Sequence, residues 1–179
     1  IRAELESRQI DALIAIGGED TLGVASKLHA AGMPLVGIPK TIDNDVNGTD
    51  YTFGFDTALT IATEAIDRLH TTAESHDRVM VAEVMGRHAG WIALEAGVAG
   101  GADFILLPEY PTSVEEVCRV VLRRHERGKN FSIIVVAEGA QLQEEAGRPV
   151  RVQGERRDSF GHVRLGGIGA CLEDHLLAR

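Results

Sequence analysis

Cysteine is scarce in this sequence, and long apolar runs are missing. Cys118 and Cys171 are the only cysteines and form no CxxC pair, so the sequence predicts no disulfide framework. No apolar run is long enough to cross a bilayer, and no signal peptide is visible. We therefore expect a cytoplasmic protein.

A surplus of positive charge and a supply of aromatic side chains are missing as well. The formal net charge of −9 argues against nucleic-acid binding as the main activity, because such domains usually carry a basic surface. It does not exclude phosphate ligands, which local groups can hold. With aromatic residues at 4%, a core must rest on valine, isoleucine, leucine and alanine, and 179 residues suffice for a domain with such a core.

Short apolar runs alternate along the chain with amphipathic stretches. The runs predict strands over residues 12–16, 34–38, 79–84, 104–107 and 131–137. The other stretches predict helices: one ending before Gly32, one over 58–69, one from about Trp91, one capped by Ser113 and one from Leu165. This alternation is typical of the α/β class, with a parallel sheet and helices on both faces.

Polar or glycine-rich sequences follow four of the predicted strands. They are GGEDT (17–21), PKTIDND (39–45), MGR (85–87) and Glu138. Parallel sheets bind ligands beyond the carboxyl ends of their strands, so these sequences are candidates for a site.

The sequence GGEDT joins a strand to a helix. Gly17 and Gly18 would let the backbone approach a phosphate, and a helix N-terminus attracts anions. The sequence is neither GxGxxG nor a Walker loop. A plain connection in which Asp20 or Thr21 caps the helix explains it equally well.

The sequence PKTIDND carries two carboxylates and a lysine. If the segment is extended, Asp43 and Asp45 point the same way, so one could accept a proton while the other holds Mg²⁺. Lys40 supplies a positive charge for a phosphate. A solvated turn rich in aspartate and asparagine is the alternative interpretation.

Isolated charges at the remaining strand ends carry less information. Arg87 could stabilise charge on a transferring phosphoryl group, although a surface salt bridge explains a lone arginine as well. Arg78 and Glu138 could each be an ordinary charge at a strand edge.

In this order, the sequences together resemble the phosphofructokinase family, and most of all its pyrophosphate-dependent members. The resemblance rests on GGEDT, PKTIDND, ESHDR (74–78), EVMGR (83–87) and AEG (137–139), with TFGFDTA (52–58) also fitting, and covers most of the chain from Ile10 to Gln141. It implies a Mg²⁺-dependent transfer of a phosphoryl group to the 1-hydroxyl of fructose 6-phosphate, a reversible step of glycolysis. It also implies a two-subdomain phosphofructokinase fold.

The resemblance implies a role for each motif residue. Asp43 would be the general base, Thr41 would lie beside the transferring group, and Arg87 would neutralise transition-state charge. The sugar would be bound by Met85, Gly86, Glu138 and, from a neighbouring subunit of a homo-oligomer, Arg78. The donor would be held by Gly17, Gly18, Asp20 and Lys40. Mg²⁺ would be held by Asp45 and by Glu19, which stands where many members have aspartate.

Asp20 favours pyrophosphate over ATP as the donor. ATP-using members have glycine there, whereas a carboxylate would repel the α-phosphate by roughly 4 kcal/mol at about 4 Å in a partly screened site. Lys40 could pair with pyrophosphate, but some ATP-using relatives also carry lysine at that position. We expect pyrophosphate as the donor, and an ATP-dependent 6-phosphofructokinase is the alternative.

The family pattern is incomplete in this chain. The N-terminal phosphate loop and the C-terminal sugar-phosphate segment have no counterpart; GHVRLGG (161–167) resembles the latter but follows Glu138 too soon, so we expect a loop and a helix start there. We expect a central fragment that is inactive alone, with a phosphofructokinase-like α/β region over 1–140. A linker-like segment and a further helix would occupy 141–179.

Two activities of other classes stay open. A non-catalytic regulatory protein that senses a sugar phosphate could keep this fold, but it would have little reason to keep Asp43, Asp45 and Arg87 together. A dinucleotide-binding oxidoreductase would need GxGxxG and an acidic residue at the next strand end, and the sequence has neither.

Overall fold

The computed structural model describes residues 1–144, 148–150 and 165–178. The chain divides into two compact units, Ile1–Asp56 and Thr57–Arg179, and the division falls within the first turn of helix α3 (Phe55–Ser75). The predicted boundary at residue 140 concerns the organisation of a longer protein and stays a prediction. In the described part of the chain, no helix is both long and apolar enough to span a membrane.

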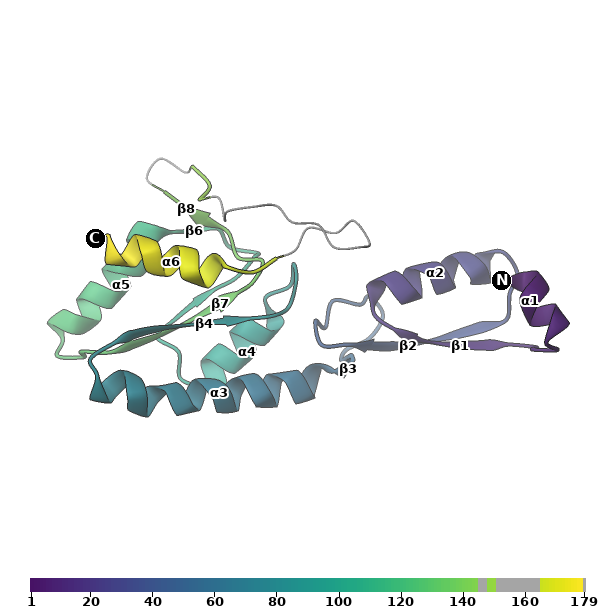
Figure 1. Ribbon diagram of the computed structural model, residues 1–179, viewed down its shortest axis with the longest axis horizontal. Coiled ribbons are helices and arrows are strands. Elements are labelled where there is room, and N and C mark those ends of the chain that lie inside the picture. The colour runs from purple at the N-terminus through teal and green to yellow at the C-terminus, as the bar shows by residue number, and fades with distance from the viewer. Residues whose placement is uncertain (145–147, 151–164, 179) are drawn as a thin grey trace. The chain divides into compact units, whose positions relative to one another are not determined.

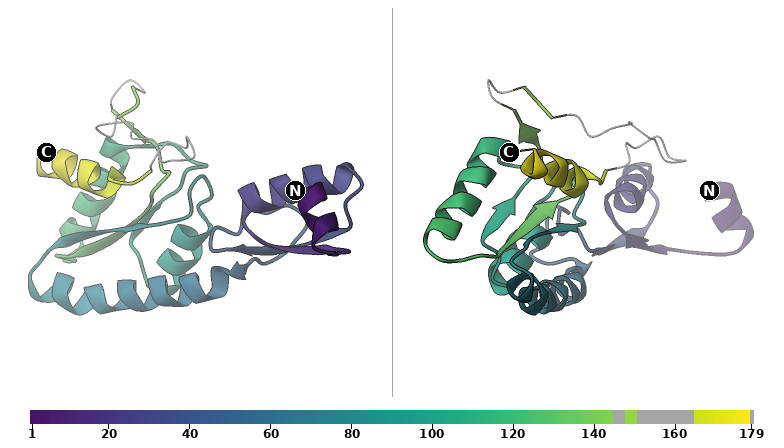
Figure 2. Two further views of the ribbon diagram at one scale, coloured as in Figure 1. Left: turned by 45° about the vertical axis from the view of Figure 1, so that its right-hand side comes forward. Right: turned by 60° about the vertical axis from the view of Figure 1, so that its left-hand side comes forward.

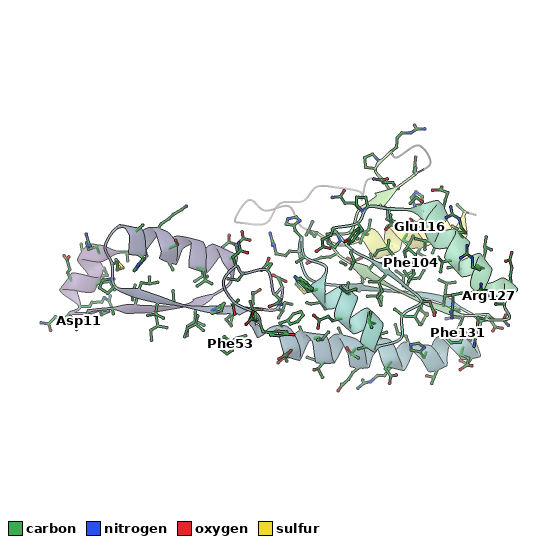
Figure 3. The ribbon with its side chains drawn as sticks, turned by 180° about the vertical axis from the view of Figure 1, so that it is seen from behind. Asp11, Phe53, Phe104, Glu116, Arg127 and Phe131 are labelled. Atoms are coloured by element: carbon green, nitrogen blue, oxygen red, sulfur yellow. The ribbon has the colours of Figure 1, made fainter. Side chains whose placement is uncertain are left out.

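The first unit is a small parallel sheet with a helix on one face. Strand β1 (Leu13–Gly17) pairs with β2 (Leu35–Thr41), which pairs with the two-residue β3 (Phe53–Gly54). Helix α2 (Glu19–Ala30) contacts both longer strands, and the short helix α1 (Arg2–Ser7) precedes them. The opposite face is apolar and exposed, with Ile14, Ile16 and Val36 each more than half accessible. Phe53 is also exposed (Figure 3).

Glycines flank both ends of helix α2. Its N-cap is Gly18, without a side-chain hydrogen bond, so the interpretation of Asp20 or Thr21 as the N-cap is wrong. Gly32 follows the C-cap with φ of 82°, a conformation that glycine adopts at little cost, and it ends the helix as predicted.

The second unit is a parallel sheet covered on both faces. Its strand order is β4 (Val79–Val84), β7 (Ser132–Ala137) and β5 (Phe104–Leu106), so β7 is central. Helices α5 (Val114–Glu126) and α6 (Ile168–Leu177) lie on one face, and α3 and α4 (Trp91–Ala99) lie on the other (Figures 1 and 2). The predicted α/β class with helices on both faces is confirmed here.

The alternation of side chains along β7 explains this layering. All six residues of β7 are buried. Ile134 and Val136 pack into the core beneath α5 and α6, whereas Ile133, Val135 and Ala137 pack into the core that contains residues of α3 and α4. Successive side chains on a strand point to opposite faces, so one apolar run serves two cores.

Several details differ from the sequence predictions. The two-residue strands β6 (Thr112–Ser113) and β8 (Leu142–Gln143) form a small parallel sheet that was not predicted. Helix α6 starts at Ile168 rather than Leu165, because Gly166 and Gly167 have φ of 108° and 84°. Ser113 caps α5 as predicted, with its Oγ accepting from Glu116 N at 3.1 Å. Residues 145–147 and 151–157 of the predicted linker, and 161–164 of GHVRLGG, lie outside the described residues.

Candidate active site

The sequences GGEDT and PKTIDND meet at one edge of the first unit. Strands β1 and β2 are parallel neighbours with Gly17 opposite Pro39, so both carboxyl ends lie at the same edge. A Cβ on Gly17 would lie 2.4 Å from Thr21 Oγ1, and a Cβ on Gly18 would lie 3.4 Å from Thr41 Cβ. The absence of a side chain at Gly17 therefore lets Thr21 in the first turn of α2 pack against the end of β1, whereas a side chain at Gly18 would make only an ordinary contact with Thr41.

Thr41, the last residue of β2, forms a hydrogen-bonded pair with Asp43. Thr41 Oγ1 donates to Asp43 Oδ2 at 3.1 Å, and Asp43 N donates to Thr41 Oγ1 at 3.3 Å. The segment is not extended, because Asn44 has φ of 54°. The alignment of Asp43 with Asp45 that an extended chain would give is therefore not available, and the Asp43 carboxylate instead accepts a hydrogen bond from the Thr41 hydroxyl.

Asn44 is a structural residue of this loop that the sequence analysis missed. Its Oδ1 accepts from Thr52 N at 2.9 Å, and its Nδ2 donates to Asp50 O at 3.4 Å. Asparagine tolerates the left-handed region better than most residues, and its short amide can bond nearby backbone. The sequence therefore indicated a turn rich in aspartate and asparagine, but the functional interpretation concerned Asp43 and Asp45 rather than Asn44.

The predicted metal ligands are Glu19 and Asp45. Glu19 is the first residue of α2, and Asp45 lies four residues beyond the end of β2. Across the described ranges, no group of three or more His, Cys, Asp or Glu side chains could hold a metal ion. Mg²⁺ is commonly held by one or two carboxylates together with substrate phosphates. A pair of acidic residues past adjacent strand ends fits a Mg²⁺ that binds with its substrate.

The MGR sequence forms a tight loop at the carboxyl end of β4 in the second unit. Gly86 and Arg87 have φ of 142° and 51°. Glu138, which follows the adjacent strand β7, accepts from Gly86 N at 3.3 Å and from Arg87 N at 3.0 Å through the same carboxylate oxygen. The predicted residues Gly86, Arg87 and Glu138 are thus brought together, and Met85 beside them is exposed.

Gly139, the last residue of the AEG motif, contacts the same loop, and the sequence did not predict this contact. A Cβ on Gly139 would lie 2.0 Å from Arg87 O, so only glycine leaves room for that carbonyl. Arg87 forms no ion pair with another described residue, which removes the salt-bridge interpretation for this part of the chain. No pattern in the sequence signals such a contact, because 52 positions separate Gly139 from Arg87.

Arg78 lies apart from these residues. It immediately precedes β4, where its O accepts from Ser132 N at 3.2 Å, whereas MGR follows the other end of that strand. Six strand residues at about 3.3 Å each place Arg78 roughly 20 Å from the end of β4, after which the MGR loop begins. Arg78 and the MGR loop therefore lie at opposite ends of β4.

The predicted residues therefore form two groups, one in each compact unit. The first contains Gly17, Gly18, Glu19, Asp20, Lys40, Thr41, Asp43 and Asp45; the second contains Met85, Gly86, Arg87 and Glu138. Neither group includes a cysteine. Burial and then the charge of Asp174 raise the pKa of the Cys171 thiol, which keeps it protonated at neutral pH and unsuited to act as a nucleophile.

Comparisons with known proteins agree with the strand-end motifs. The family model described as phosphofructokinase matches residues 1–179. The chain is 64% identical to a pyrophosphate--fructose 6-phosphate 1-phosphotransferase from Amycolatopsis methanolica over 179 residues, or 100% of this chain and 51% of the relative. It is 56% identical to an ATP-dependent 6-phosphofructokinase from Corynebacterium efficiens over the same shares. The chain thus spans about half the length of these curated relatives.

Solved structures give the same result for the fold. A phosphofructokinase from Saccharomyces cerevisiae has a TM-score of 0.75 and 34% sequence identity, covering 97% of this chain and 24% of that one. A pyrophosphate-dependent phosphofructokinase from Marinobacter aquaeolei has a TM-score of 0.67 and 31% identity, covering 77% of this chain and 39% of that one.

Proposed function

The chain belongs to the phosphofructokinase family, and we propose that its protein transfers a phosphoryl group from pyrophosphate to the 1-hydroxyl of fructose 6-phosphate. The products would be fructose 1,6-bisphosphate and phosphate, in a reversible, cytoplasmic step of glycolysis. The observation that carries the proposal is the placement of the motifs, each at the carboxyl end of a parallel strand, where α/β enzymes bind ligands.

Asp43 is the general base in this proposal. The hydrogen bond from Thr41 Oγ1 to Asp43 Oδ2 helps to orient the carboxylate, which would accept the proton of the sugar 1-hydroxyl. The resulting alkoxide oxygen attacks the nearer phosphorus of pyrophosphate while the bond to the leaving phosphate breaks. Thr41 lies beside the transferring group.

Charge neutralisation does much of the remaining work. Glu19 and Asp45 would hold Mg²⁺, which offsets the negative charge of the donor when it is bound. Arg87 offsets charge that develops on the transferring group. The φ of 51° at Arg87 and the hydrogen bond from its N–H to Glu138 fix the backbone from which this side chain extends.

The sugar is bound by the second unit in this proposal. Met85 and Gly86 line its pocket, and Glu138 bonds its hydroxyls with the carboxylate oxygen that does not accept from the loop. Arg78 binds the sugar phosphate in a neighbouring subunit of a homo-oligomer. Its distance of roughly 20 Å along β4 from the MGR loop supports that assignment.

Asp20 is the proposed determinant of donor choice. Gly18 is the N-cap of α2, so Asp20 lies in the first turn of the helix beside the glycines that would hold the donor. A second negative charge there disfavours the α-phosphate of ATP but leaves room for pyrophosphate, and Lys40 can pair with pyrophosphate. ATP is the second candidate, because curated relatives of 56% and 57% identity are named ATP-dependent enzymes.

The experiment offers ATP and pyrophosphate separately to the full-length protein with fructose 6-phosphate and Mg²⁺. We expect a higher kcat/KM with pyrophosphate, and we expect Asp20→Gly to gain activity with ATP. Adding Lys40→Gly tests whether the two positions act together. Asp20→Asn serves as a matched control, because it keeps the size of the side chain and removes its charge.

Each outcome has a separate meaning. A wild-type enzyme that prefers ATP overturns the donor assignment and leaves the phosphoryl transfer in place. An unchanged donor preference in Asp20→Gly assigns Asp20 to the stability of α2 alone, where glycine in the first turn should cost up to about 1 kcal/mol through helix propensity and loss of a charge near the helix N-terminus. Binding of fructose 6-phosphate without turnover by either donor would indicate a sugar-phosphate sensor instead.

A further inference from the structure

Glu109 reaches from the end of strand β5 to the loop that precedes helix α4. Its Oε1 accepts from Gly90 N at 2.8 Å. Gly90 is the N-cap of α4, is buried and has no side chain with which to cap the helix itself. A buried backbone N–H needs an acceptor, and a carboxylate is favoured beside the N-terminus of a helix.

The fit around Gly90 is close. A Cβ at this position would lie 2.7 Å from Glu109 Oε2 and 2.8 Å from Leu107 Cδ2. Pro108 Cδ would be 3.1 Å away. The missing side chain at Gly90 therefore leaves room for the Glu109 carboxylate, whose hydrogen bond joins two segments 19 residues apart in the chain.

Glu109 completes a two-point attachment of the MGR loop. Glu138 holds the first end through Gly86 N and Arg87 N, and Glu109 holds the last residue before α4. Between these points the loop closes on itself, with Ala89 N donating to Gly86 O at 2.9 Å. Only residues 88 and 89 lie between the two attachments, so the hydrogen bond at Gly90 lies three residues from Arg87 in the chain.

We propose that Glu109 is a positioning residue that sets the location of Arg87 for phosphoryl transfer. This inference rests on the proposed function, in which Arg87 neutralises transition-state charge. Glu109 itself contacts neither substrate. Its effect passes through the backbone of residues 87–90, so loss of its hydrogen bond lowers turnover by displacing Arg87.

The test compares Glu109→Ala, Glu109→Gln and Arg87→Ala in the full-length enzyme. We expect Glu109→Ala to lower kcat by about 10- to 100-fold, as displacement of a catalytic group by about 1 Å does, and to leave KM for the donor within about 2-fold. Glu109→Gln keeps a carbonyl oxygen as acceptor, so we expect its kcat within about 3-fold of wild type. In the double variant, Glu109→Ala should add no further loss to Arg87→Ala, because both act on one group.

A control separates positioning from general destabilisation. Val117→Ala removes buried methyl groups from the core beneath α5, far from the loop in sequence, and should lower the melting temperature without changing kcat. Amide hydrogen–deuterium exchange of the peptide over residues 85–91 should quicken in Glu109→Ala and not in Val117→Ala. If Glu109→Ala fails to fold, Glu109→Asp, which shortens the side chain by one methylene, takes its place with the same expectations.

The outcomes distinguish the inference from the function on which it rests. Wild-type turnover in Arg87→Ala would refute the proposed role of Arg87. A defective Arg87→Ala beside a fully active Glu109→Ala, or losses that multiply in the double variant, would refute the positioning role of Glu109 alone.

Discussion

Replacing Gly139 with alanine places a methyl group where the carbonyl of Arg87 lies. An ideal Cβ on Gly139 is 2.0 Å from Arg87 O and 3.1 Å from Arg87 C, and both atoms belong to backbone that cannot rotate away as a side chain could. A close carbon–oxygen contact needs about 3.3 Å, so the loop or the strand end must move by roughly 1.3 Å.

The size of this displacement sets the expected effect. A misplacement of about 1 Å at a catalytic site can cost about 100-fold in rate, and an added methyl in a packed region costs about 1–3 kcal/mol. We therefore expect Gly139→Ala in the full-length enzyme to lower kcat about 100-fold. We expect its free energy of unfolding to fall by about 1–3 kcal/mol.

Steady-state kinetics with fructose 6-phosphate and denaturant unfolding test both values. Gly23→Ala is the control: a Cβ on Gly23 meets nothing within 4 Å, and Gly23 lies inside helix α2. This control should keep kcat and add up to about 1 kcal/mol of stability, because alanine favours a helix. A Gly139→Ala enzyme with wild-type kcat would refute the argument that the backbone of Arg87 must stay in place for turnover.

Three further predictions concern the site as a whole. Asp43→Ser should lower kcat by about 10²- to 10⁴-fold with little change in sugar affinity, and steady-state kinetics that gave a near-normal kcat would remove Asp43 from the role of general base. Inactive Arg78→Ala subunits mixed with inactive Asp43→Ser subunits should regain part of the activity, since one shared site can receive both intact residues; no recovery in verified mixed oligomers would contradict a shared site. The purified 179-residue chain should show no phosphoryl transfer in a coupled assay, because it spans half the length of its relatives, and robust activity would contradict that expectation.

Most of the regular structure could be predicted from the sequence, because buried strands and helices leave apolar runs and amphipathic periodicity in the sequence. The predicted strand over 79–84 coincides with β4, and the helix from about Trp91 coincides with the start of α4. Strands of two residues, such as β6 and β8, have no periodicity to detect, and they depend on a partner far along the chain. The late start of α6 depends on the left-handed conformation of Gly166 and Gly167, which their presence alone does not reveal.

The site could be predicted as a set of motifs but not as a set of contacts. The carboxyl ends of neighbouring parallel strands lie at the same edge of a sheet. The sequences that follow β1 and β2 therefore lie close together, and so do those that follow β4 and β7. The roles of Glu109 and Gly139 depend on bonds to, or close approach of, backbone atoms, which side-chain patterns do not encode. The bend at Asn44 likewise overrode the extended geometry that would have aligned Asp43 with Asp45.

The order of strands in the second unit has a consequence for synthesis on the ribosome. The central strand β7 is the last of the three to be made, and roughly 50 residues separate the end of β4 from the end of β7. At 5–20 residues per second, β4 waits about 3 to 10 s for β7, the neighbour that pairs with both outer strands. The wait for β5 is shorter, because β5 is made after β4. During that interval their apolar faces and unpaired edges are available to chaperones, and the sheet forms only once β7 has left the exit tunnel.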